Sequence, residues 1–445
     1  MPGPLTPSRR RARRGWGVGA ALLSIGVAAT LGGCTTGRDA GATPSAPAAA
    51  TASAGSGSRA DVAGTTAAVA DLLRARAAAL AAGDEEAYAA TVADPSSASG
   101  RRQLDSFVAA RALRVSRLEV AEPVLDRAGD TSPTSPVRAE VVLRYRVDDL
   151  DRGDRVARLG YDLVRSVAGW TVEAERPVGP GATAPWVAMP TLEVARGVHG
   201  VVAGTVPAAR LAEHLAVVDR AVPPLREQWR DTPRRVLVLA PASVTEADAL
   251  LGRPARSGAA PVAATTEGPT GAGGTATGDR VVLDPTAFAR LTASGRDVVL
   301  THELAHVAVR SSVPGRPATW LAEGYADHVG YDRADVPSRR LVAPLVAAIR
   351  SGQEPHGLPT TSDLQPASGE IEVPYLLAWQ AVELIARDHG EAALRRLVAA
   401  AASTGSDADA EAATDAALVS ELGTTRAELT GRWLTRLGDL GTNPG

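Results

Sequence analysis

The sequence of 445 residues predicts an α+β protein with two domains. Apolar residues recur at helical spacing in some segments and alternate with polar residues in others, which indicates both helices and strands. In the first half of the chain, helical segments precede a run of alternating segments, an order typical of α+β layers. About 385 residues follow the polar N-terminal region, and this length exceeds what one hydrophobic core usually holds.

The first 33 residues read as a bacterial lipoprotein signal peptide. Five arginines cluster near the start, at Arg9, Arg10, Arg11, Arg13 and Arg14. The apolar run 18–31 is too short to span a bilayer comfortably. It ends in small residues before Cys34, which resembles the lipobox, in which the cysteine is lipidated after cleavage just before it. An uncleaved anchor or an ordinary cleavage site is the alternative, and the sequence leaves general and twin-arginine export open.

Residues 34–60 consist almost entirely of Ala, Thr, Ser, Gly and Pro. Such a composition cannot bury enough apolar surface to fold, so we expect a disordered tether. Lipidated Cys34 would then hold the folded part at the extracytoplasmic face of the cell membrane, and as the only cysteine it cannot form an internal disulfide. The net charge of −3 and the pI near 6.2 give no basic surface for nucleic acid.

Residues 61–175 are expected to form the first α+β domain. An apolar helix is broken at Gly83, Asp84 can cap a second helix, and alternating segments follow from residue 113 to residue 174. The order resembles the cone of nuclear-transport-factor-like and SnoaL-like proteins. Such cones often enclose a pocket, but no acid/base pair stands out here, so we interpret the domain as a spacer or substrate-presenting module.

Residues 176–190, rich in Gly and Pro, are the expected linker, and residues 191–445 the second domain. The apolar pattern in the first half of this second domain predicts a strand at 192–203, a helix at 208–229, a strand at 235–239 and a helix at 244–251. A Gly/Thr-rich loop at 268–278 is expected to be disordered, with a lid as the alternative. The region after residue 341 predicts helices at 341–349, 375–387, 392–402 and 426–437.

The chemistry is expected at His302, Glu303 and His306, which form a His-Glu-x-x-His pattern. On a helix, residues four apart leave the same face, so both imidazoles can bind one zinc ion. Glu303 lies beside them and can act as general base towards the attacking water. A chance occurrence, or a site that has lost its metal, is the alternative.

Two histidines leave a zinc site incomplete, and Glu323, with sixteen residues between it and His306, is the expected third ligand. Asp327 lies four residues further on, on the same helical face. Its carboxylate can accept the far N–H of a ligand histidine and fix the tautomer of that ring.

These residues, together with the Trp320–Gly324 run, resemble the gluzincin metallopeptidases, in particular the peptidase MA-like group. The resemblance covers roughly the last 250 residues. It implies a thermolysin-like α+β domain, one Zn²⁺, and a peptide or protein substrate whose carbonyl is attacked by zinc-activated water. It also implies that an edge strand at 262–266 binds extended substrate through its main chain.

The resemblance nominates Tyr375, at the start of a helix, as the hydrogen-bond donor to the developing oxyanion. The alternatives are His328 as the donor, or Tyr375 as a boundary aromatic packed on the core. No Gly-x-Met-Glu-Asn stretch precedes the zinc helix, so exopeptidase specificity is not supported. His199, His214, His356 and His389 lack ligand spacing.

The leading hypothesis is therefore a membrane-tethered, extracytoplasmic zinc metallopeptidase. The alternative is a non-catalytic lipoprotein in which the first domain binds a partner and zinc is structural. A structural site fills all four positions with protein ligands, whereas a catalytic one keeps a position open.

Overall fold

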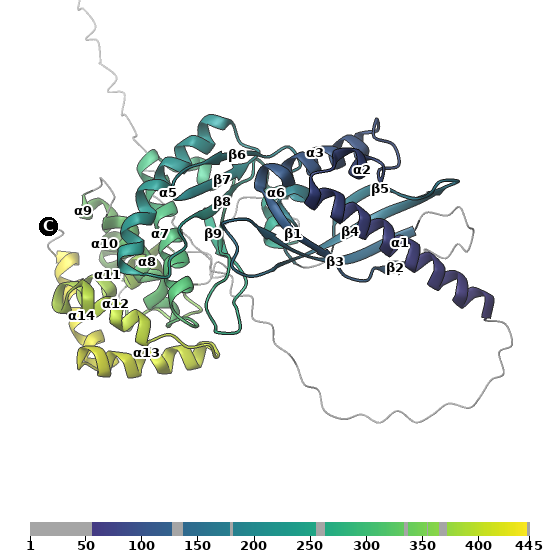
Figure 1. Cartoon of the computed structure of the whole chain (residues 1–445). Coiled ribbons are helices and arrows are strands. Elements are labelled where there is room, and N and C mark those ends of the chain that lie inside the picture. Colours follow the sequence, from purple (N-terminus) through teal and green to yellow (C-terminus); the bar gives the residue numbers. More distant parts are fainter. Residues whose placement is uncertain are drawn as a thin grey trace, which may run out of the picture.

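The computed structural model of the protein describes residues 56–126, 137–178, 181–254, 263–332, 337–353, 355–364 and 372–442. The expected signal peptide, Cys34 and nearly all of the expected tether lie outside the described residues. Within the described part of the chain, no helix is long and apolar enough to cross a membrane. Helices and two five-stranded sheets make up the fold, which agrees with the α+β expectation at this level (Figure 1).

The first sheet belongs to the N-terminal third of the described chain. The helices before it are α1 (Ser56–Ala82), α2 (Glu85–Ala89) and α3 (Ala98–Leu113). Its strands are β1 (Val115–Val120), β2 (Val124–Asp126), β3 (Val137–Val147), β4 (Arg155–Ser166) and β5 (Gly169–Pro177). The order is β1-β3-β4-β5, with β2 also paired to β3, and the pairings are antiparallel. Asp84 caps α2 by accepting from the Ala87 amide, which confirms that prediction.

One face of this sheet is buried against α1 and α3. Burial alternates along β3, so that its inward residues, such as Leu143 and Tyr145, join the same core as Leu73 of α1. A pocket of about 310 Å³, including its open mouth, lies in this domain. On its wall, Arg76 forms a buried ion pair with Glu175 at 3.6 Å and the Tyr161 hydroxyl donates to Glu175.

The expected linker segment contains helix α4 (Pro185–Ala188), whose four side chains are all buried. Trp186 packs edge-to-face on Tyr145 of β3, with ring centroids 4.8 Å apart. The backbone amide of Thr183 donates to Ala249 in helix α6 (Val244–Leu251). The segment that joins the two domains is thus itself packed between them.

The second sheet has a parallel centre and antiparallel edges. Its strands are β6 (Glu193–Arg196), β7 (Gly200–Gly204), β8 (Val236–Ala240), β9 (Ala264–Glu267) and β10 (Arg280–Leu283), in the order β6-β7-β8-β10-β9. The single strand expected at 192–203 is instead the hairpin β6–β7. Asp219 of α5 (Ala208–Gln228) stabilises its turn by accepting from the amides of Val198 and His199.

The two faces of this sheet belong to different cores. In β8, Val236, Val238 and Ala240 pack with α5 and with α7 (Ala293–Ser312), which carries the His-Glu-x-x-His pattern. The intervening Leu237 and Leu239 pack with α4, α6 and the N-terminal domain. Successive strand residues point to opposite faces. The sheet is therefore a middle layer between the N-terminal domain and helix α7.

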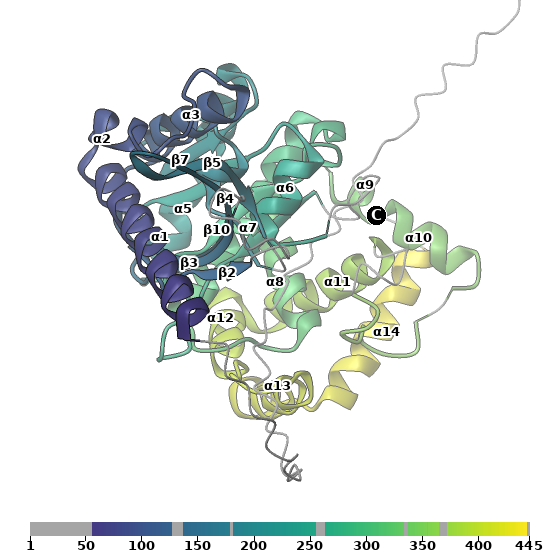
Figure 2. The same cartoon turned by 90° about the vertical axis from the view of Figure 1, so that its right-hand side faces the viewer.

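The C-terminal half is helical, as expected (Figure 2). After the short η1 (Phe288–Arg290), its helices are α7, α8 (Thr319–Asp332), α9 (Ser338–Leu341), α10 (Ala343–Arg350), α11 (Glu372–His389), α12 (Glu391–Ala400), α13 (Asp407–Leu422) and α14 (Arg426–Thr442). Helix α13 was not among the predicted helices; it begins with a capping box at Ser406 and ends at Gly423 in the left-handed conformation.

The expected disorder of the Gly/Thr-rich loop is wrong. Residues 268–279, here called the β9–β10 loop, are held at several points. Arg310 of α7 donates from Nη2 to the Gly268 carbonyl and from Nε to Asp279, and its own carbonyl accepts from the Ala276 amide. These bonds satisfy backbone groups that composition alone suggested would face water.

Candidate metal centre

Helices α7 and α8 bring the expected ligands together. Helix α7 begins at the cap Thr292, whose side chain accepts from the Gly295 amide, and carries His302 and His306 one turn apart. Helix α8 approaches α7 closely at Gly330, where an added Cβ would lie 3.1 Å from the Val298 carbonyl oxygen. A small residue at this crossing lets Glu323, on the same helix, reach the two imidazoles.

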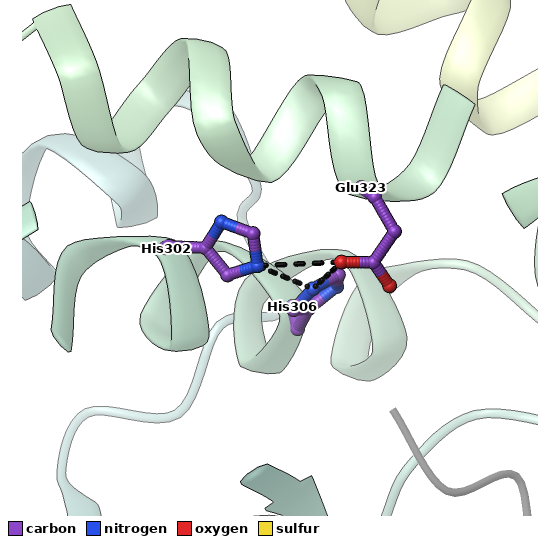
Figure 3. Close-up of side chains that lie close together, drawn as sticks. All are labelled: His302, His306 and Glu323. Atoms are coloured by element: carbon purple, nitrogen blue, oxygen red, sulfur yellow. Dashed lines mark hydrogen bonds and ion pairs between the residues drawn. The ribbon is translucent and has the colours of Figure 1, made fainter. Parts of the chain in front are cut away.

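Three ligand atoms converge in this site (Figure 3). The Nε2 atoms of His302 and His306 are 3.1 Å apart, and Glu323 Oε2 lies 3.4 Å and 3.3 Å from them. Zinc–ligand bonds of 2.0–2.1 Å in a tetrahedron place neighbouring ligand atoms about 3.3 Å apart. The spacing therefore fits three corners of a tetrahedral site. Among the described residues, no further His, Cys, Asp or Glu joins this group.

The chemistry of the donors also calls for a cation. His302, Glu303, Glu323 and Asp327 are at most 2% exposed, and His306 is 7% exposed. Glu323 Oε2 is buried without a hydrogen-bond partner among the described residues. With neutral histidines, the three carboxylates would place three negative charges where water is excluded, which is costly. Burial raises the pKa of both Glu303 and Asp327, whereas His306 and His302 overcome burial and hold the pKa of Glu323 at about 2.

Asp327 lies directly behind His302. Its Oδ1 is 2.8 Å from Nδ1 of His302, so the ring donates Nδ1–H to this carboxylate and turns its Nε2 atom towards Glu323 and His306. Burial lowers the pKa of His302, but Asp327 and Glu323 outweigh it and raise the pKa to about 10. The ring is thus held by a carboxylate in the orientation that a metal ligand needs.

Glu303 lies next to the ligand pair and is oriented by strand β9. The hydroxyl of Thr266 donates to Glu303 Oε2 at 2.5 Å, and Oε1 is buried without a partner among the described residues. One oxygen is therefore fixed by the strand, and the other is free to accept a proton. Thr266 was expected in the edge strand, but its contact with Glu303 was not predicted, because a threonine within a strand carries no sequence signal of its partner.

Tyr375 lies in the first turn of α11 and is 3% exposed. Burial raises its pKa well above the usual range, and Glu323, Asp327 and Glu303 raise it further, in part through a side-chain hydrogen bond with Glu323. The phenol is therefore neutral and lies beside the third ligand.

His328 is directed elsewhere. Its Nδ1 lies 2.7 Å from Glu383 of α11, and its Nε2 lies 3.0 Å from Glu391 of α12. Both ring nitrogens thus have partners outside the metal centre. The structure therefore brings His302, Glu303, His306, Glu323, Asp327 and Tyr375 together and places His328 apart from them.

Comparisons with known proteins give no family for this chain. No family model matches the sequence, and no curated protein sequence matches it. A solved structure of a protein of unknown function from Mycobacterium tuberculosis shares 13% identity, covering 38% of this chain and 95% of the other, with a TM-score of 0.23. A score this low carries no conclusion about fold or function.

Proposed function

We propose that this chain is a zinc metallopeptidase that hydrolyses peptide bonds of peptide or protein substrates. The observation that carries the proposal is the buried group of His302, His306 and Glu323, whose three ligand atoms lie at tetrahedral spacing. No fourth imidazole, thiolate or carboxylate completes the group among the described residues. A position left open is the mark of a catalytic zinc site, and this argues against the alternative with a structural zinc.

A zinc ion held here would act as a Lewis acid and lower the pKa of a coordinated water towards 7. The protein's own residues would manage the proton. Glu303, fixed through Oε2 by Thr266, would accept the proton of the attacking water and deliver it to the leaving amine. Asp327 would keep His302 in the tautomer that binds the metal.

Tyr375 would donate a hydrogen bond to the oxygen of the attacked carbonyl as negative charge develops there. Its raised pKa keeps the proton on the phenol, as this role requires. Strand β9 pairs with β10 on one side and ends its sheet. Its other edge would bind extended substrate through main-chain hydrogen bonds; Val262, the first residue of the expected edge strand, lies outside the described residues.

We place the enzyme at the extracytoplasmic face of a bacterial membrane, anchored through lipidated Cys34. This part of the proposal rests on the sequence of residues 1–60. The domain types are also proposed: a nuclear-transport-factor-like cone at residues 61–175 and a gluzincin domain at residues 191–445. The antiparallel sheet with preceding helices and the mixed sheet followed by two ligand-bearing helices support these types.

The test combines metal analysis with peptide cleavage. Wild type should bind one zinc per chain and cleave members of a quenched peptide library. Glu323→Ala should lose the metal, while Glu303→Gln should keep it and stop cleaving. Glu383→Gln, which alters a carboxylate bound to the non-ligand His328, is the matched control and should bind zinc and cleave peptides like wild type. Zinc binding with unchanged cleavage by Glu303→Gln would refute the mechanism, and zinc without any cleavage would favour the binding lipoprotein.

A further inference from the structure

The N-terminal domain contacts the edge of the second sheet that faces the metal centre. Arg155, the first residue of β4, is 5% exposed and forms an ion pair with Glu267 at the end of β9. Its Nη1 also donates to the Gly278 carbonyl in the β9–β10 loop at 2.6 Å. One arginine of the first domain therefore binds both ends of the connection that follows strand β9.

Residues 148–154, the β3–β4 connection, extend this contact. The Arg152 amide donates to the Thr277 carbonyl at 2.6 Å, and Arg152 Nη2 donates to the Ala276 carbonyl at 2.9 Å. Arg280 of β10, 2% exposed, is bound by Asp151 at 3.1 Å and by the Tyr145 hydroxyl at 2.8 Å. Separating a buried ion pair would leave an uncompensated charge, so these contacts favour the observed docking of the two domains.

The opposite face of β9 carries the contact to the proposed general base. Glu267 and Thr266 are neighbours in the strand, so their side chains point to opposite faces. Glu267 reaches Arg155 of the N-terminal domain, while Thr266 donates to Glu303 on α7. A strand of four residues at a sheet edge has pairing on one side only, so its position depends on what holds its side chains.

We propose that Arg155 is a positioning residue of the metal centre: it holds β9 through Glu267 and thereby sets where Thr266 places the Glu303 carboxylate. The N-terminal domain then helps to set the geometry of the metal centre and is not only a spacer. The effect on turnover rests on the proposed peptidase function, whereas the effect on β9 does not.

The test compares Arg155→Met with Arg76→Met in the full chain. Arg76 forms a buried ion pair with Glu175 and donates to Thr91 and Tyr88, which all lie in the N-terminal domain, so it is a matched control for the loss of a buried arginine. Hydrogen–deuterium exchange of peptides covering residues 263–268 measures the order of β9 directly. We expect exchange there to quicken roughly tenfold in Arg155→Met and to stay near wild type in Arg76→Met.

Peptide cleavage gives the second readout. With zinc content unchanged, kcat should fall about tenfold to a hundredfold in Arg155→Met, because small misplacements of a reacting group are costly. Arg155→Lys, which keeps a cation near Glu267, should recover part of both effects. If Arg155→Met does not fold, Glu267→Gln removes the same pair from the other side and carries the comparison.

Unchanged β9 exchange in Arg155→Met would overturn the proposal, and so would an equal change in Arg76→Met, because the effect would then be general destabilisation. If wild type cleaves no peptide, the proposed function fails, while the exchange experiment still decides whether Arg155 positions β9.

Discussion

Replacing Asp327 with asparagine should weaken zinc binding without removing a ligand. The Asp327 carboxylate and the His302 ring are both fully buried and lie 2.8 Å apart. Asparagine keeps an oxygen that can accept the Nδ1–H bond but removes the charge. A hydrogen bond to a charged group contributes about 1.5–3 kcal/mol, against about 1 kcal/mol for a neutral one. The difference of about 0.5–2 kcal/mol corresponds to roughly 2- to 30-fold weaker binding.

The assay is a zinc titration of the purified protein in competition with a chelating indicator at pH 7. Glu383→Gln is the control, because Glu383 also binds a histidine of α8, His328, at 2.7 Å but lies outside the ligand group. Its zinc affinity should match wild type. The reasoning is refuted if Asp327→Asn binds zinc within twofold of wild type, or if Glu383→Gln loses as much affinity.

Three further predictions concern the base, the helix packing and acid stability. Thr266→Val removes the donor to Glu303, so kcat should fall about tenfold with zinc content unchanged; an unaltered kcat would contradict the role of this bond. Gly324→Ala would place a Cβ 2.5 Å from a carbonyl oxygen of α11, so it should lower the free energy of unfolding by about 1–3 kcal/mol in urea titrations. Gly431 has open space around it, so Gly431→Ala is the control and should not destabilise the protein. Burial, aided by nearby arginines, lowers the pKa of His214 to about 4. The unfolded chain takes up this proton near pH 6.5, so stability should fall as the pH drops from about 6.5 to about 4, with a loss of about 1–2 kcal/mol at pH 5. Unfolding curves at pH 7 and pH 5 measure this loss, and His214→Phe should not show it.

Local patterns were sufficient for several elements. Helix α6 has the bounds that its apolar pattern predicts, and Asp84 caps α2 as expected. These features depend on neighbouring residues along the chain, through side-chain periodicity and cap hydrogen bonds. The hairpin β6–β7 was predicted as one strand because its turn is fixed by Asp219, a residue on the following helix.

The order of the β9–β10 loop also could not be predicted from local sequence. Its Gly and Thr residues give no apolar pattern, so composition predicts disorder. The partners that order it, Arg152 in the first domain and Arg310 on α7, are distant in the sequence. No local rule identifies such partners, because they become neighbours only when the domains dock.

By itself the sequence determined the candidate ligands: the spacing of His302 and His306 places both side chains on one face, because helix geometry fixes residues four apart, and Glu323 follows on the next helix. Only the tertiary structure decided what surrounds them. It placed Thr266 on Glu303, set Tyr375 beside Glu323, and docked Arg155 onto strand β9. The physical reason is that these contacts join separate elements, and their geometry follows from how whole layers pack and not from any period within one segment.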